Sequence, residues 1–317
     1  MGNATASLSG GNQTGDDSMT DSKMPGPIGN GKNAYQVLQR IGGGGDGVVF
    51  RARHIESGKT VAIKHLMHPG YKFASFVHIL KRLPEDPAIV KVIDYVRLDA
   101  GGYREEQFVV MEYLPERSGF RSLRDAIRSA TTLRNGTLPL ADVLCAFKTY
   151  ARGLRFLHAN VGWPNAIKPS ALYYDEANPE ESKIMDFNWP LSDERSCFPM
   201  FDFDFNYVSP EASLADSRRD ARMDIYALGL CFYEALSGQA AYPRLPAGRA
   251  AYAALWERIK SKTPPTFDSP LVMVNPKLLA LLQDMTDIDP EKRIRDAAEV
   301  ERRIVEILDE QGKTRAS

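Results

Sequence analysis

Apolar residues between about residue 35 and residue 114 follow the pattern of short β-strands. Runs rich in Val, Ile, Phe and Tyr cover residues 35–41, 48–53, 60–64, 90–96 and 107–114. Clusters of Gly, Pro and Asp separate these runs, as is typical of strands joined by turns. We therefore predict a five-stranded sheet. Pro69 and Gly70 interrupt the connection between its third and fourth strands.

Beyond about residue 115 the apolar spacing becomes helical. A short helical run covers residues 123–127, and a long helix is predicted from about Leu140 to His158. Its apolar positions are Val143, Leu144, Phe147, Tyr150, Ala151, Leu154 and Leu157. We interpret this stripe as core packing and not as a cofactor site. A sheet followed by helices predicts an α+β fold.

The two ends of the chain differ in composition from the part between them. Residues 1–33 are rich in Gly, Asn, Ser, Thr and Asp and contain almost no bulky apolar side chains. Such a segment cannot bury enough apolar surface to offset the entropy lost on ordering. We expect a disordered N-terminal tail over residues 1–33, a folded domain over residues 34–310 and a short tail over residues 311–317.

Composition and charge exclude several classes of partner. The 317 residues include 40 Lys and Arg against 41 Asp and Glu, and a net charge of -1 gives no field that would attract nucleic acid or an anionic membrane. Cys145, Cys197 and Cys231 lie far apart, so we expect reduced thiols and no metal cluster. The chain has no apolar run long enough for a transmembrane segment and no secretory signal, so we expect a soluble cytoplasmic protein. N-myristoylation is not expected, because Ala6 stands where its pattern requires Ser or Thr.

A glycine-rich segment joins the first two predicted strands, and a lysine follows on the third. Glycines allow backbone N–H groups to approach phosphate oxygens closely, and a lysine on the next strand can neutralise phosphate charge. The residues concerned are Gly42, Gly44, Gly47, Val49, Ala62 and Lys64. A G-x-G-x-x-G pattern alone is also compatible with a flexible hairpin. Followed by the strand T-V-A-I-K, however, it resembles the signature set of the protein kinases.

Further motifs in the same order extend the resemblance from Tyr35 to Leu308. Residues 111–114 resemble the kinase hinge, which meets adenine through Met111, Glu112 and Tyr113. Residues 186–188, Asp-Phe-Asn, resemble D-F-G, and residues 209–211, Ser-Pro-Glu, resemble A-P-E. The resemblance implies a bilobal protein-kinase-like fold with an antiparallel N-lobe sheet over residues 34–114 and a mainly helical C-lobe over residues 115–310. It also implies that Glu211 pairs with Arg293 and that Asp224 holds the backbone of the catalytic loop.

The segment that resembles the kinase catalytic loop lacks the groups that perform the chemistry. Residues 167–169, Ile-Lys-Pro, fit the L-K-P part of H-R-D-L-K-P-x-x-N, with Lys168 as the matching lysine. In this register Pro164, Asn165 and Ala166 occupy the H-R-D positions. Ala166 thus replaces the proton acceptor, and Ala171 replaces the metal-binding Asn. A methyl group can neither accept a proton nor bind a cation.

Other substitutions weaken the implied nucleotide site. The resemblance implies a helix between the third and fourth strands, ending near residues 79–83, and Pro69 and Gly70 before it lead us to expect a shortened one. The family's Glu on this helix, which holds the phosphate lysine, aligns with Phe76, and Glu85 and Asp86 follow too late to replace it. Asp46 places a negative charge at the tip of the glycine-rich segment, and Tyr173 stands where the family has an aliphatic residue beneath adenine. Asp186 is left as a weak metal ligand. We expect weak or absent ATP binding and little or no contribution from Mg²⁺.

Groups that build the fold therefore match the family, whereas groups that perform phosphoryl transfer do not. We interpret the chain as a pseudokinase, a scaffold or allosteric binding partner for other proteins in signalling, such as an active kinase. The alternative is an atypical active Ser/Thr kinase that uses ATP, with Asp186 as its only metal ligand and catalysis mainly by positioning. A relation to small-molecule kinases is disfavoured by residues 209–211 and the helices that follow. The alternation of aromatic and polar residues over 201–207 predicts an extended strand.

Overall fold

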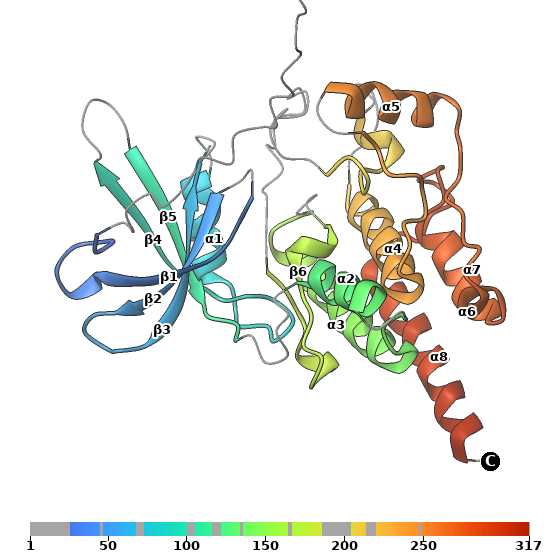
Figure 1. The fold of residues 1–317 in the computed structure, drawn as a ribbon, viewed down its shortest axis with the longest axis horizontal. Coiled ribbons are helices and arrows are strands. Elements are labelled where there is room, and N and C mark those ends of the chain that lie inside the picture. The colour runs from blue at the N-terminus through green and yellow to red at the C-terminus, as the bar shows by residue number, and fades with distance from the viewer. Residues whose placement is uncertain are drawn as a thin grey trace, which may run out of the picture.

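Two lobes make up the described part of the chain, an N-terminal sheet and a C-terminal body of helices (Figure 1). The computed structural model describes residues 26–44, 47–67, 73–99, 105–115, 122–133, 136–163, 167–185, 204–213, 220–246 and 249–316. The predicted α+β, bilobal architecture is confirmed. Among the helices described, none is both long and apolar enough to cross a membrane.

The N-lobe is a five-stranded antiparallel sheet with the strand order β1-β2-β3-β5-β4. Its elements are β1 (Tyr35–Gly44), β2 (Gly47–His54), β3 (Thr60–Leu66), α1 (Phe73–Arg82), β4 (Val92–Asp99) and β5 (Glu105–Glu112). The cross-strand partners Phe50, Ile63 and Val110 lie on one face and form a small core there. The opposite face meets α1, which has only 10 residues, in agreement with the prediction of a short helix.

The ordered fold begins earlier than the predicted boundary at residue 33. Ile28 is 1% exposed and packs in the N-lobe core. Its backbone exchanges hydrogen bonds of 2.9 and 2.8 Å with Tyr35, across a turn that contains the 3-10 helix Gly31–Asn33. One buried apolar side chain and two backbone hydrogen bonds therefore fix the end of this polar segment against the sheet. The rest of the predicted tail, residues 1–25, lies outside the described residues.

The C-lobe is built from helices and one short hairpin. Its helices are α2 (Leu123–Leu133), α3 (Leu140–Asn160), α4 (Arg222–Ser237), α5 (Arg249–Lys260), α6 (Pro270–Met273), α7 (Pro276–Met285) and α8 (Ala297–Ala316). The hairpin pairs β6 (Leu172–Tyr173) with β7 (Lys183–Ile184), and the 3-10 helices are η2 (Pro169–Ala171), η3 (Pro179–Glu181) and η4 (Pro210–Ser213). Residues 311–316 of the predicted C-terminal tail are helical, because α8 continues to Ala316.

Helix α4 is the centre of the C-lobe. Every residue from Arg222 to Leu236 is buried, so the helix is enclosed on all sides. A Cβ atom at Gly229 would lie 2.6 Å from the side chain of Thr286 and 2.9 Å from that of Met285. Helix α7 can therefore approach α4 this closely only because position 229 carries no side chain.

A short strand contact joins the two lobes. Ile89 forms a parallel bridge with Ile184 of β7, and the Ile184 amide donates a hydrogen bond of 2.8 Å to the carbonyl oxygen of Ala88. A Cβ at Gly153 of α3 would lie 3.1 Å from Ala88, so this glycine lets α3 pack tightly beneath the contact. The loop before β4 is thus anchored in the C-lobe core.

The prediction of an extended strand over residues 201–207 is wrong for residues 204–207, the part that the structure describes. Residues 204–207 form a turn, in which the Tyr207 amide donates to the Asp204 carbonyl oxygen over 3.0 Å. The amide of Asn206 donates to the Asp204 carboxylate over 3.3 Å. Asp and Asn side chains favour such turns by bonding to nearby backbone, which overrides the alternating pattern. Residues 201–203 lie outside the described residues.

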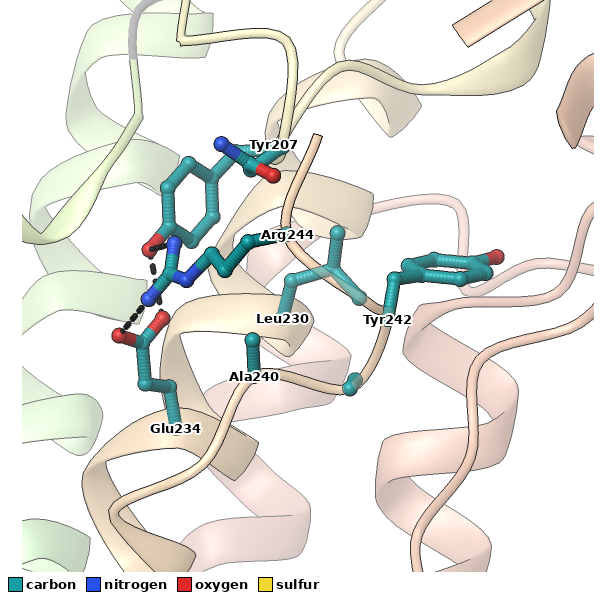
Figure 2. Close-up of a pocket in the computed structure, with 8 residues that line it drawn as sticks. Tyr207, Leu230, Glu234, Ala240, Tyr242 and Arg244 are labelled. Atoms are coloured by element: carbon teal, nitrogen blue, oxygen red, sulfur yellow. Dashed lines mark hydrogen bonds and ion pairs between the residues drawn. The ribbon is translucent and has the colours of Figure 1, made fainter. Parts of the chain in front are cut away.

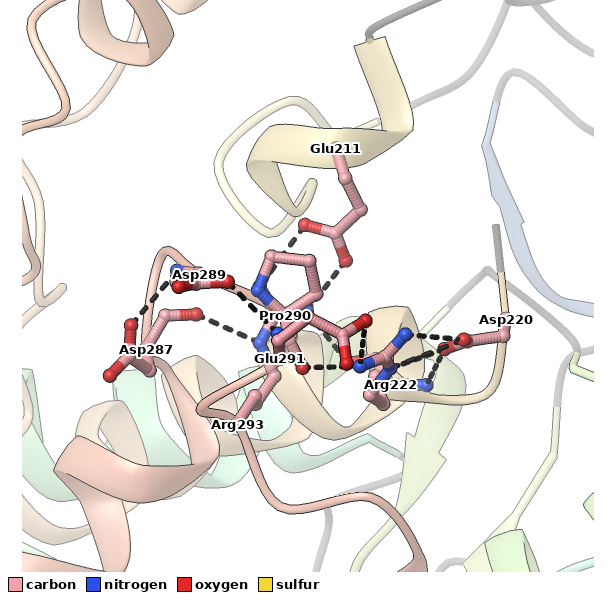
Figure 3. Close-up of polar contacts among 8 residues, drawn as sticks. All are labelled: Glu211, Asp220, Arg222, Asp287, Asp289, Pro290, Glu291 and Arg293. Atoms are coloured by element: carbon pink, nitrogen blue, oxygen red, sulfur yellow. Dashed lines mark hydrogen bonds and ion pairs between the residues drawn. The ribbon is translucent and has the colours of Figure 1, made fainter. Parts of the chain in front are cut away.

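A buried ion pair connects the segment before α4 with the turn before α8 (Figure 3). Arg293 donates to both carboxylate oxygens of Glu211, over 2.6 and 3.1 Å, as the resemblance implied. The Arg293 side chain is 0% exposed, and it also donates to the carbonyl oxygens of Asp287 and Arg222 over 2.9 and 3.0 Å. All three guanidinium nitrogens are therefore paired inside the protein.

We predict that Glu211→Gln destabilises the protein by about 3–5 kcal/mol, because it leaves the Arg293 charge buried without its counter-ion. Urea unfolding followed by circular dichroism measures this change. The matched control is Glu306→Gln, which removes an exposed carboxylate paired with Arg302 on the surface of α8. The control should unfold close to the natural chain. Equal effects of the two substitutions would contradict the prediction.

Candidate functional site

Four of the predicted nucleotide-binding residues lie on one face of the N-lobe sheet. Val49 is the cross-strand partner of Lys64, and Ala62 is the partner of Met111. Cross-strand partners share a face, and Ala62 and Lys64 are two residues apart on β3, so all four side chains project to the same side. Val109, the other partner of Lys64, packs in the core shared with the C-lobe, so this face is directed at the C-lobe. Ala62 is 8% and Lys64 9% exposed.

The glycine-rich segment is a tight β-hairpin. Gly42 pairs with Val49 and Gly44 with Gly47. Gly45 and Asp46, the tip of the predicted glycine-rich segment, lie outside the described residues. Gly47 has φ of 152°, and a Cβ there would lie 2.0 Å from the carbonyl oxygen of His65. The start of β2 can approach β3 this closely only with glycine. Gly47 therefore has a structural role in addition to the predicted role toward phosphate.

The predicted hinge residues follow at the end of β5. The Glu112 carboxylate accepts hydrogen bonds from the backbone amide of Lys91 over 2.8 Å and from the Lys183 ammonium group over 2.7 Å. Lys183 belongs to β7, so this ion pair connects the hinge to the C-lobe hairpin. The guanidinium group of Arg51, on the candidate nucleotide face, lies 5.8 Å from the centre of the Tyr113 ring.

Tyr173, which the resemblance places beneath adenine, is held at both ends. Its hydroxyl donates to the carbonyl oxygen of Pro115 over 2.9 Å and lies 3.5 Å from the Asp175 carboxylate. Its own carbonyl oxygen accepts from the Tyr150 hydroxyl over 2.8 Å. Burial raises the pKa of Tyr150 well above its ordinary value, so this donor stays protonated. Tyr173 is 3% exposed, and its hydroxyl connects β6 to the chain that follows the hinge.

Ala171 lies beside the start of the Asp-Phe-Asn run. Its carbonyl oxygen accepts from the amide of Met185 over 2.9 Å, and Met185 directly precedes Asp186. Its own amide donates to the carbonyl oxygen of Lys168 over 2.8 Å, which closes the turn η2. The resemblance implies a metal ligand at position 171, but the methyl group of Ala171 is 0% exposed and offers no donor atom. The described residues at this position do not fit Mg²⁺.

Several predicted site residues fall outside the described part of the chain. These are Pro164, Asn165, Ala166, Asp186, Phe187 and Asn188, together with the side chain of Phe76 in α1. The role of Asp224 toward the catalytic loop remains a prediction for the same reason. Within the described residues, no three His, Cys, Asp or Glu side chains form a group that could hold a metal ion.

Three polar contacts around the site were not predicted. His158 Nε2 lies 2.9 Å from Oδ2 of Asp224, whose side chain is 0% exposed, and this contact joins α3 to α4. The other two are the contacts of Lys183 with Glu112 and of Tyr173 with Pro115, described above. The partners are 66, 71 and 58 residues apart in sequence. Neither periodicity nor a local motif relates residues at such separations.

A family model described as "protein kinase domain" matches residues 35–303, which include both lobes and all the elements described above from β1 into α8. The chain belongs to the protein kinase family. It is 26% identical over 281 residues to serine/threonine-protein kinase pkn2 of Myxococcus xanthus, covering 84% of this chain and 31% of that protein. It is 32% identical over 228 residues to serine/threonine-protein kinase A of Synechocystis sp., covering 65% of this chain and 41% of that protein. This kinase-family chain therefore spans less than half the length of these two relatives.

We predict that Gly47→Ala destabilises the protein by about 1–3 kcal/mol, because the new methyl group would meet the His65 carbonyl at a strained φ. Gly42→Ala is the matched control, since the nearest atom to a Cβ at Gly42 is 3.9 Å away. Thermal unfolding of both variants measures the difference. The account of Gly47 is wrong if the two variants unfold at the same temperature.

Proposed function

We propose that this member of the protein kinase family does not transfer phosphate and acts as a scaffold or allosteric binding partner for other proteins. The observation that carries the proposal is the buried methyl group of Ala171, next to the residue that precedes Asp186. A kinase holds its second magnesium ion through an Asn at this position. The sequence supports the same conclusion at Ala166, which replaces the proton acceptor.

The expected size of the catalytic loss follows from the missing groups. Loss of a positioned general base alone costs on the order of 10² to 10⁴ in rate. Loss of a metal ligand adds to this, because the metal ions neutralise charge that develops on the transferred phosphoryl group. Position 76, where the family's helix Glu would hold Lys64, is a Phe and cannot form that ion pair. These effects together would reduce transfer below detection.

For nucleotide, we propose weak ATP binding that Mg²⁺ improves little. Lys64 and Val49 on the sheet face, with the hairpin glycines, support binding. The Tyr173 ring opposes it, because its bond to Pro115 fixes a large side chain at the implied floor of the adenine site. We expect an affinity nearer 0.1 mM than 1 μM, a difference of roughly 3 kcal/mol. Asp186 would be the only carboxylate left for a metal ion.

The second candidate function is an atypical active Ser/Thr kinase, and the names of the relatives favour it. Both relatives described above are named serine/threonine-protein kinases. Activity would then depend on positioning and on Asp186 as the single metal ligand. For either function we propose a cytoplasmic location and protein partners.

A phosphotransfer assay decides between the two candidates. We predict that the purified chain, given radiolabelled ATP, Mg²⁺ and a generic protein substrate, incorporates no more label than the variant Lys64→Met. Lys64→Met is the matched control, because it removes the phosphate lysine and leaves a side chain of similar length. Robust labelling by the natural chain that Lys64→Met abolishes would overturn the proposal and establish the active kinase.

A further inference from the structure

The segment at residues 204–213, which leads into α4, is attached to several distant elements through its first four residues. The Arg258 side chain of α5 donates to the carbonyl oxygen of Phe205 over 3.0 Å. The amide of Leu245 donates to the side-chain oxygen of Asn206 over 3.0 Å. Asp204 and Tyr207 contact charged groups of α2, α4 and the chain after α4, as described next. The turn at 204–207 is therefore fixed from outside as well as by its own hydrogen bonds.

Asp204 forms an ion pair with α2. The Arg124 guanidinium group donates to Oδ2 of Asp204 over 2.7 Å, and the two side chains are 33% and 21% exposed. The other carboxylate oxygen accepts from the side chain of Asn206 over 2.7 Å. Burial by itself would raise the pKa of Asp204, but the hydrogen bonds from Asn206 and Arg124 outweigh it and leave the pKa below its ordinary value. The carboxylate is thus charged and paired near neutral pH.

Tyr207 joins the same segment to α4 and to the chain that follows it (Figure 2). Its hydroxyl donates to Glu234 over 2.5 Å and accepts from Arg244 over 3.0 Å, and Arg244 also pairs with Glu234. The guanidinium groups of Arg124 and Arg244 lie 6.0 and 5.8 Å from the centre of the Tyr207 ring. Tyr207 and Glu234 are 5% and 6% exposed, so the hydrogen bond between them is shielded from solvent, whereas the Arg244 side chain is 44% exposed.

Many kinases order the segment before A-P-E by phosphorylation, which places a new anion opposite an arginine. Residues 204–211 occupy this position in the chain. Here Asp204 already supplies an anion to Arg124. The sequence contains no Ser or Thr from residue 198 to residue 208, and the nearest preceding ones are Ser192 and Ser196. We infer that fixed charges hold residues 204–213 in one conformation, with Asp204 taking the place of a phosphate group, so that this segment is ordered without phosphorylation. The inference is independent of the proposed function, because an active and an inactive kinase could both use such a segment.

Hydrogen–deuterium exchange of the full chain tests the ion pair. In Asp204→Asn, amides of residues 204–213 should exchange about tenfold faster than in the natural chain, because a charge-assisted hydrogen bond is lost. Amides of α7 and α8 should be unchanged. Arg124→Met should give the same increase, and the double variant no more than either single one. The matched control is Glu180→Gln, which breaks the Lys148–Glu180 pair, also 2.7 Å long, elsewhere on the C-lobe.

Two outcomes would overturn the inference. The first is an exchange rate of residues 204–213 that is the same in Asp204→Asn, in Tyr207→Phe and in the natural chain. The second is an increase in that rate when the purified natural chain is treated with phosphatase until mass spectrometry detects no phosphate. We expect phosphatase to change nothing. Tyr207→Phe removes only a hydroxyl, so it provides the test if Asp204→Asn does not fold.

Discussion

The C-lobe depends on the enclosure of one charge, the guanidinium group of Arg293. Arginine stays protonated in proteins, and a charge without solvent must be fully paired. Its partners are Glu211 and the carbonyl oxygens of Asp287 and Arg222. They belong to three separate parts of the chain: the segment before α4, the first turn of α4 and the turn before α8. These parts must come together at once, because any one missing partner would leave the buried cation unsatisfied.

This constraint positions the segment that carries the second network. Residues 204–213 end at η4, which contains Glu211, so the ion pair fixes one end of the segment. Asp204 and Tyr207 fix the other end against α2 and α4. Separately, the contacts of Glu112 with Lys183 and of Tyr173 with Pro115 fix the hinge to the β6–β7 hairpin. None of these contacts involves the proton acceptor or a metal ligand of phosphoryl transfer. Substitutions at those catalytic positions therefore leave the contacts that hold the kinase fold in place.

The strands, the long helix and the buried Glu211–Arg293 pair could be predicted from the sequence, because each has a periodic or motif-based signal. The turn at Asp204 could not, since an alternating aromatic pattern is overridden when Asp and Asn side chains bond to nearby backbone. The packing of Ile28 in the N-lobe core was not predicted, because the average composition of residues 1–33 is polar and does not indicate the role of one apolar residue. Motif position placed Tyr173 in the site, but only the structure shows that its hydroxyl bonds to Pro115.

The central claim is that the fold of a nucleotide site is retained while its metal coordination and its floor are altered. Thermal unfolding of the natural chain and of Tyr173→Leu, with ATP in the presence and absence of Mg²⁺, tests it most directly. Each shift is taken relative to the same variant without ligand. The account predicts that millimolar ATP stabilises the natural chain slightly, that Mg²⁺ changes this little, and that Tyr173→Leu gains a larger shift. Stabilisation of the natural chain at micromolar ATP that requires Mg²⁺ would contradict it.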